Sequence, residues 1–143
     1  PNMTATTIGV NTNQIVNPNG QLCTAYVWTA IPGYSAFGSY TGNNSTDGPF
    51  IYTGFKPAFV LIRVINAQTN WVVIDSTRNP SNPANLYLHP NLTDNESGNI
   101  TQQTDMLSNG FKFRSNWNNI NYTYTYVYAA FAENPFQSPV TAR

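Results

Sequence analysis

The chain has 143 residues, of which six are Lys or Arg and six are Asp or Glu, so its formal net charge is zero. Its length suits one domain with its own core. Six cations are too few for the clustered basic surface of a nucleic-acid binder or for an electrostatic membrane anchor. No apolar run approaches the roughly 20 residues of a spanning helix, and the first ten residues do not resemble a signal peptide. Because the sequence starts with Pro1, we expect it to be processed or excised from something longer.

The composition favours strands joined by neutral polar loops. Charged residues make up 8% of the chain, well below the ~25% of most soluble domains, whereas 41% of the residues are hydrophobic and 14% are aromatic. This hydrophobic content argues against disorder. Asn favours turns, while Thr and Tyr favour strands. Such a composition is typical of an all-β protein that works outside a cell or on a virion surface.

Alternating apolar runs, interrupted by Pro and Asn-Gly, predict about eight strands. The run at residues 58–65 is broken only by Arg63, which predicts a strand buried on both faces. Residues 71–76 should pair with it in an antiparallel hairpin. The spacing implies two packed antiparallel sheets, an all-β, jelly-roll-like β-sandwich. In chain order, the predicted strands are residues 22–30, 34–41, 50–53, 58–65, 71–76, 86–89, 111–114 and 121–132.

Several side chains in these strands carry specific expectations. Arg63 needs a partner within the apolar run, and Asp75 is the candidate, although Asp75 could pair with Arg78 instead. The single Cys23 lies in an alternating run, so we expect a buried thiol without a disulfide inside the chain. Alternation should place four tyrosines of the last strand on one face, namely Tyr122, Tyr124, Tyr126 and Tyr128.

A short echo in the sequence suggests a repeat. Residues 24–30 read TAYVWTA and residues 124–130 read YTYVYAA. We interpret the first as a strand equivalent to the second, with chance similarity between two aromatic strands as the alternative. We therefore divide the chain into residues 1–32, the end of a preceding repeat or a linker, residues 33–137, the β-sandwich domain, and residues 138–143, a C-terminal tail. The first part is too poor in apolar residues for its own core and should pair with the following unit or a neighbouring protomer.

The following residues resemble a known family. Residues 33–43 read GYSAFGSYTGN and residues 48–58 read GPFIYTGFKPA. They resemble the opening of a β-sandwich domain that recurs in tail-fibre and virion-surface proteins of tailed phages, notably marine and cyanobacterial ones. The resemblance continues through residues 71–78 and 107–114 and ends at YAAFAENPF, residues 128–136. It implies a structural module, often in tandem and near C-termini, with no catalytic residues to carry over.

Residues for catalysis or metal binding are sparse. His89 is the only histidine, and no nucleophile motif lies near it. The carboxylates show no evident acid–base pair for glycoside cleavage, so a glycan hydrolase is only a minor alternative. Asp94, Asn95 and Glu96 offer oxygen ligands for Ca²⁺ but lack the spacing of a calcium loop. We predict no catalytic residue, no metal and no cofactor.

Polar loops are the candidate binding sites, because long loops in compact domains are often functional. Residues 78–85 and 116–119 are rich in Asn, and residues 91–105 are expected to form one long polar loop. Trp117 lies in a polar turn with no obvious core to enter, so it is the candidate platform for a sugar or partner. The ligand-binding residues predicted from these loops are Trp117, Asn116, Asn118, Asn79, Asn82, Asn85, Asp94 and Asn95.

These observations predict a non-enzymatic virion module. The leading interpretation is the C-terminal domain of a phage tail fibre or host-recognition appendage that binds a cell-surface glycan or other receptor. The alternative is a capsid decoration or fibre-shaft module that contacts only virion proteins. Expected partners are other virion proteins and a host glycan, without nucleic acid or membrane insertion. We also expect a homo-oligomer, a trimer, with the tyrosine face of the last strand packed between protomers.

Overall fold

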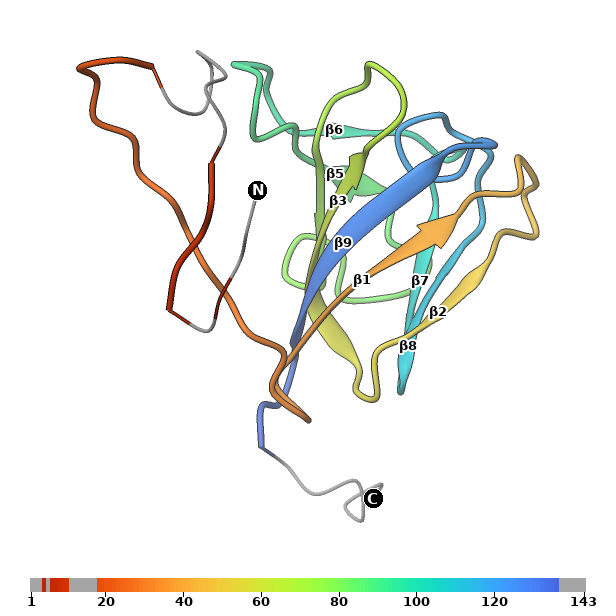
Figure 1. Ribbon diagram of the computed structural model, residues 1–143. Helices are drawn as coiled ribbons and strands as arrows, with labels where there is room; N and C mark the ends of the chain where they lie inside the picture. Colours follow the sequence, from red (N-terminus) through yellow and green to blue (C-terminus); the bar gives the residue numbers. More distant parts are fainter. Residues whose placement is uncertain (1–3, 5, 11–17, 137–143) are drawn as a thin grey trace.

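The computed structural model describes residues 4, 6–10 and 18–136, which contain nine strands and no helix (Figure 1). All strand pairs are antiparallel, so the predicted all-β, sandwich-like fold is confirmed. No helix among these residues has the length and apolar character needed to cross a membrane. The largest sheet has the order β1 (Ser35–Thr41), β9 (Thr125–Ala132), β3 (Pro57–Val64) and β4 (Val72–Asp75). The second sheet has the order β2 (Phe50–Tyr52), β8 (Gly110–Phe113) and β7 (Thr104–Leu107), and β5 (Leu86–Tyr87) pairs with β6 (Ser97–Gly98).

The predicted central hairpin is confirmed as β3 and β4, in which Leu61 lies opposite Val73. Side chains alternate along β3, and its inward side chains Val60, Ile62 and Val64 are at most 1% exposed. The outward side of β3 is only half-buried. The prediction that this strand is buried on both faces is therefore wrong, because the second sheet covers only the inner side.

The predicted pairing of Arg63 with Asp75 is also wrong. The strand register places Asp75 opposite Phe59, four residues along β3 from Arg63. Asp75 instead forms an ion pair with Arg78, in which Oδ2 lies 2.5 Å from Nη2. Arg63 donates a hydrogen bond to the carbonyl of Thr69, and its guanidinium lies 5.9 Å from the ring centroid of Trp71.

The last strand of the described chain, β9, lies in the middle of the large sheet, between β1 and β3. Tyr126 is fully buried and stacks on Tyr40 with ring centroids 4.9 Å apart. Tyr128 packs edge-on against Phe111 of the second sheet. Two of the four tyrosines that were expected to pack between protomers, Tyr126 and Tyr128, therefore point into the core instead. The other two tyrosines, Tyr122 and Tyr124, precede the strand and contact each other.

Two short strands form where the sequence predicts one long loop. Residues 91–105 contain β6 and the first two residues of β7. The two residues of β6 are exposed and pair only with β5, so they carry no hydrophobic alternation. In β7, Thr104 and Met106 are buried, but the alternation spans only four residues. Neither strand leaves a pattern long enough for recognition from sequence.

The predicted strand at residues 22–30 does not form. We call residues 18–30 the arm, and Figure 1 shows it rising apart from β1 and β9. An alternating apolar segment becomes a strand only beside another strand, and the arm pairs with none in the described chain. Cys23 lies in the arm and is exposed, so the expectation of a buried thiol is wrong for the same reason.

A buried asparagine joins two distant loops of the sandwich. The carboxamide of Asn121 is fully buried, and its Oδ1 accepts a hydrogen bond from the backbone N–H of Asn43 at 2.9 Å. Its Nδ2 donates to three oxygens at 2.8–3.0 Å. The loop that contains Gly42 and Gly48 lies very close to the segment around Asn121. A Cβ on Gly42 would lie 1.9 Å from the Tyr122 carbonyl oxygen, and a Cβ on Gly48 would lie 2.7 Å from Nδ2 of Asn121. Glycine is therefore required at both positions.

Replacing Asn121 should strongly destabilise the fold. Asn121→Ala removes every bond of this buried carboxamide and leaves its partners unpaired, so we expect a loss of about 3 kcal/mol or more in the free energy of unfolding. Urea denaturation measures this loss. Asn118→Ala, which truncates an exposed amide, is the matched control and should change stability by less than about 0.5 kcal/mol. Equal stability of the two variants would contradict the role of Asn121.

Stability should decline in alkali because of buried tyrosines. Burial raises the pKa of Tyr126 from 10.0 to about 12, and burial also raises the pKa of Tyr40. A raised pKa stabilises the fold fully below the unfolded-state pKa, and this contribution is lost as the pH rises through the folded-state pKa. Urea midpoints should therefore hold steady up to about pH 10 and fall toward pH 12. Tyr126→Phe should make the fall of the urea midpoint with pH shallower. An unchanged fall would contradict the assignment of this alkaline loss of stability to Tyr126.

Candidate functional site

The asparagines of residues 78–85 hydrogen-bond within the fold. Oδ1 of Asn79 accepts from the backbone N–H groups of Asn85 and Leu86, at 3.1 and 2.7 Å. The carboxamide of Asn82 pairs with both the N–H and the carbonyl of Met106, each at 2.8 Å. Asn85 accepts at its own Oδ1 from Asn79. These three predicted ligand-binding residues thus hold their loop against β5 and β7.

Trp117 is a packing residue as well as a surface residue. Its half-buried indole contacts Tyr87, with ring centroids 4.6 Å apart, and His89, at 5.8 Å. The expectation that this side chain has no core to enter is wrong, because the indole packs against the edge of the hydrophobic core beside β5. His89 contributes to the same cluster and donates through Nδ1 to the carbonyl oxygen of Trp71, at 2.7 Å.

The other predicted loop residues are exposed. Asn116 and Asn118 flank Trp117, while Asp94 and Asn95 lie between β5 and β6. Within the described chain, the side chains of these four residues form no hydrogen bond, although the backbone carbonyl of Asn118 accepts one from the hydroxyl of Tyr126 at 2.8 Å. The neighbouring Glu96 lies 3.5 Å from Nε of Arg78. Across residues 4, 6–10 and 18–136, no three His, Cys, Asp or Glu side chains gather closely enough to hold a metal ion.

A larger feature that sequence reasoning missed is an apolar surface on the outer side of the four-stranded sheet, which we call the outer face. It results from alternation, since most of the residues between the buried ones of β3, β4 and β9 are also apolar. The exception is Arg63 near the end of β3, whose guanidinium lies next to the ring of Trp71. Phe131 is surrounded by aromatic rings, with centroids 5.9 to 6.1 Å away. The outer face comprises Phe37, Phe59, Leu61, Trp71, Val73, Val127, Ala129 and Phe131.

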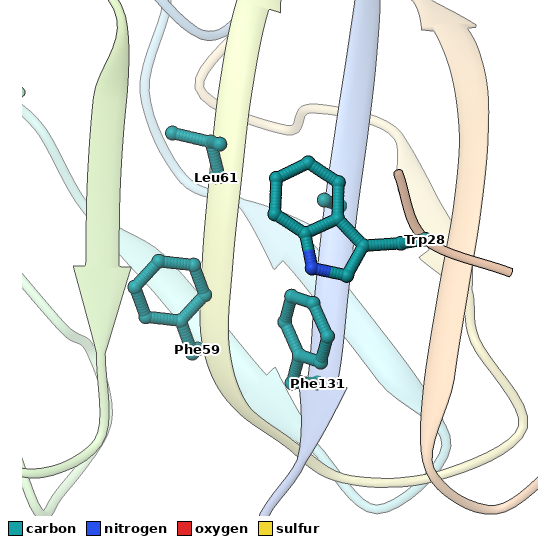
Figure 2. Close-up of a pocket in the computed structure, with 5 residues that line it drawn as sticks. Trp28, Phe59, Leu61 and Phe131 are labelled. Atoms are coloured by element: carbon teal, nitrogen blue, oxygen red, sulfur yellow. The ribbon is translucent and has the colours of Figure 1, made fainter. Parts of the chain in front are cut away.

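Two shallow hollows lie side by side on the outer face and share Phe59 and Leu61. The first has a volume of about 360 Å³ and is also lined by Trp28, Ala129 and Phe131. Figure 2 shows the indole of Trp28 reaching from the arm over these side chains.

The second hollow, of about 310 Å³, continues toward β4 and is lined by Phe59, Leu61, Trp71, Val73, Pro90 and Asn91. The carboxamide of Asn91 is already engaged, because it accepts from the N–H of Trp71 and donates to Asn70. Neither hollow is lined by a charged side chain. Both therefore suit apolar groups better than sugars, whose hydroxyls need hydrogen-bonding partners.

Trp117→Ala should destabilise the fold by about 2 kcal/mol, because it removes the indole from its contacts with Tyr87 and His89. Trp28→Ala is the matched control. Its indole is 58% exposed and belongs to the arm, so its loss should cost less than about 0.5 kcal/mol. Urea denaturation of both variants makes the comparison. A larger loss in the free energy of unfolding for Trp28→Ala than for Trp117→Ala would contradict the packing role of Trp117.

Comparison with known proteins identifies one family. No curated protein and no solved structure matches the chain. The family described as "Domain of unknown function (DUF7483)" matches residues 1–135, a span that includes the arm and all nine strands of the described chain. The match covers nearly the whole sequence, and the chain belongs to the DUF7483 family.

Proposed function

We propose that the chain is a non-enzymatic structural module that assembles with protein neighbours in a phage virion through its outer face. The observation that carries this proposal is the continuous apolar surface of the four-stranded sheet, with its two hollows that share Phe59 and Leu61. Apolar patches of this kind mark interaction sites on soluble proteins. The virion setting is supported by the resemblance of residues 33–58 and 128–136 to a domain of phage structural proteins.

The chemistry of the outer face favours a protein partner over a substrate. General acid–base and nucleophilic catalysis need a titratable side chain within reach of the reacting atoms. The linings of the two hollows contain none. Aromatic and aliphatic side chains in shallow hollows instead match the apolar core of a protein–protein interface.

Receptor binding through loops is the second candidate function. Its support is the exposure of Asn116, Asn118, Asp94 and Asn95, whose side-chain amide and carboxylate groups form no hydrogen bond within the described residues. Neutral amides next to an aromatic side chain suit recognition of a glycan. Binding of this kind would be weak for each site and would gain strength from several copies on one particle.

Co-expression with the virion proteins encoded beside this chain tests the proposal. Leu61→Lys places a charge on the outer face and should abolish co-purification with a neighbour. Tyr52→Lys is the matched control, since Tyr52 is an exposed apolar residue of the second sheet, 67% accessible, and it should leave co-purification intact. Urea midpoints of both variants establish that they fold. Equal co-purification of both variants would refute assembly through the outer face.

Host-cell binding by the purified chain separates the second candidate. If the loops recognise a receptor, Asn116→Ala together with Asn118→Ala should reduce binding, while Leu61→Lys should not. The reverse pattern would exclude these loops as the receptor site. Because the loop and outer-face variants are assayed side by side, each function can fail without the other.

A further inference from the structure

The arm exposes apolar side chains that the described chain does not cover. Leu22 is 103% exposed, Tyr26 is 78% exposed and Val27 is 69% exposed. Residues 18–30 contain no charged side chain. An extended, uncharged segment with this much apolar surface gains free energy when another protein surface buries it.

The arm has the side-chain pattern of a strand with one aromatic side. Tyr26 and Trp28 lie on the same side and stack, with ring centroids 6.1 Å apart and planes 18° apart. In the sequence echo these two residues correspond to Tyr126 and Tyr128 of β9, both of which pack against aromatic rings of the core. No backbone N–H of residues 22–30 donates a hydrogen bond to another described residue. The arm is thus suited to a packed environment that its own chain does not supply.

The outer face already accepts one side chain of the arm. Trp28 contributes to the first hollow, together with Phe59, Leu61 and Phe131 (Figure 2). Its indole nevertheless remains 58% exposed, and the second hollow has no arm residue in its lining. The hydroxyl of Ser35 at the start of β1 donates a hydrogen bond to the carbonyl of Thr29 in the arm, at 2.9 Å, and the arm leads away from the sheet from there (Figure 1). The chain's own arm therefore leaves the outer face incompletely covered.

We infer that the outer face binds the arm of a second copy of this chain, so that copies associate by exchanging arms. The aromatic side of one arm, Tyr26 and Trp28, then lies on the hollows of its neighbour, which share Phe59 and Leu61. This inference rests on the proposed function, because it takes the outer face to be a protein-binding surface. It adds the identity of the partner and the segment that docks.

The area available favours a second copy over a foreign partner. A buried aromatic side chain contributes roughly 150–250 Å², and stable interfaces bury about 1,200–2,000 Å² in total. The aromatic side of a single arm, with Leu22, Tyr26 and Trp28, reaches at most the lower end of that range, even when the surface it covers is counted. An exchange in which every copy both gives an arm and receives one multiplies the buried area in a closed assembly. Residues 18–30 and the linings of the two hollows contain no charged side chain. The charged group beside them is Arg63, whose guanidinium lies 5.9 Å from the ring centroid of Trp71.

The mass of the full chain in solution, measured against concentration by sedimentation, tests this inference. We expect an oligomer at micromolar concentrations whose dissociation constant rises at least about tenfold in Trp28→Asp and in Leu61→Lys. Tyr52→Lys should leave it within about twofold. A chain that stays monomeric at all concentrations, or an oligomer that both variants leave intact, would overturn arm exchange. Urea midpoints confirm that each variant is folded.

The single exposed cysteine provides a second, independent readout. Cys23 lies in the arm, so donor and acceptor dyes on separate preparations should give energy transfer after mixing, and Trp28→Asp should abolish it.

Failure of this inference is distinguishable from failure of the proposed function. A chain that is monomeric, but co-purifies with a virion protein in a way that Leu61→Lys abolishes, overturns only arm exchange. An oligomer that depends on Trp28 and Leu61, but captures no virion protein, overturns only the virion assignment.

Discussion

The hydrogen bonds of one buried carboxamide, that of Asn121, fix the position of the first loops of the sandwich against the last. They link residues 76 to 78 positions apart in the chain. A buried amide left without partners costs far more than a satisfied one contributes, so these bonds form together or not at all. The loops around Asn121 approach each other so closely that positions 42 and 48 require glycine. Residues 38–49, which read GSYTGNNSTDGP, thus have a structural role.

The polar and charged residues of this protein are largely occupied with one another. Ion pairs engage Lys56 with Glu133, Arg78 with Asp75, Lys112 with Asp47 and Arg114 with Asp105. Most of the asparagines in residues 78–85 are likewise satisfied internally. Recognition by this chain consequently falls to apolar surface and to a few exposed amides. Binding through such groups depends little on ionic strength, because screening acts on charges.

The sequence predicts the strands whose side chains alternate over several residues, since alternation reports burial on one side of a sheet. This holds for β1, β3, β4 and β9, which form the large sheet. It fails for β6, where Ser97 and Gly98 carry no apolar signal, and for the arm, where the signal is present but no neighbouring strand is available. Alternation of apolar side chains indicates that a segment can form a strand, but it does not indicate whether a neighbouring strand is available to pair with it.

The candidate site was harder to predict for a related reason. An apolar run such as residues 58–65 does not reveal whether one or two layers cover the strand, so the pattern predicts burial on both faces and does not predict an exposed outer face. The polar surroundings of Trp117 in the sequence predict a platform, because its packing partners Tyr87 and His89 lie about thirty residues earlier in the chain. Both errors concern contacts between distant residues. The local sequence pattern determines which side chains share a face of a strand. Only the packing of the whole fold determines which face remains exposed to solvent.

The central position of β9 has a consequence for the order in which the protein is built. Synthesis produces β1 and β3 early, yet each pairs with β9, and β9 is the last strand of the described chain to be made. Until then β1 lacks its only partner in the sheet, and β3 has β4 alone. Contacts between distant residues also slow folding, because the chain between them must first be brought together. The nascent chain therefore presents open strand edges to its surroundings for most of its synthesis, and the sandwich closes only when translation has passed Ala132.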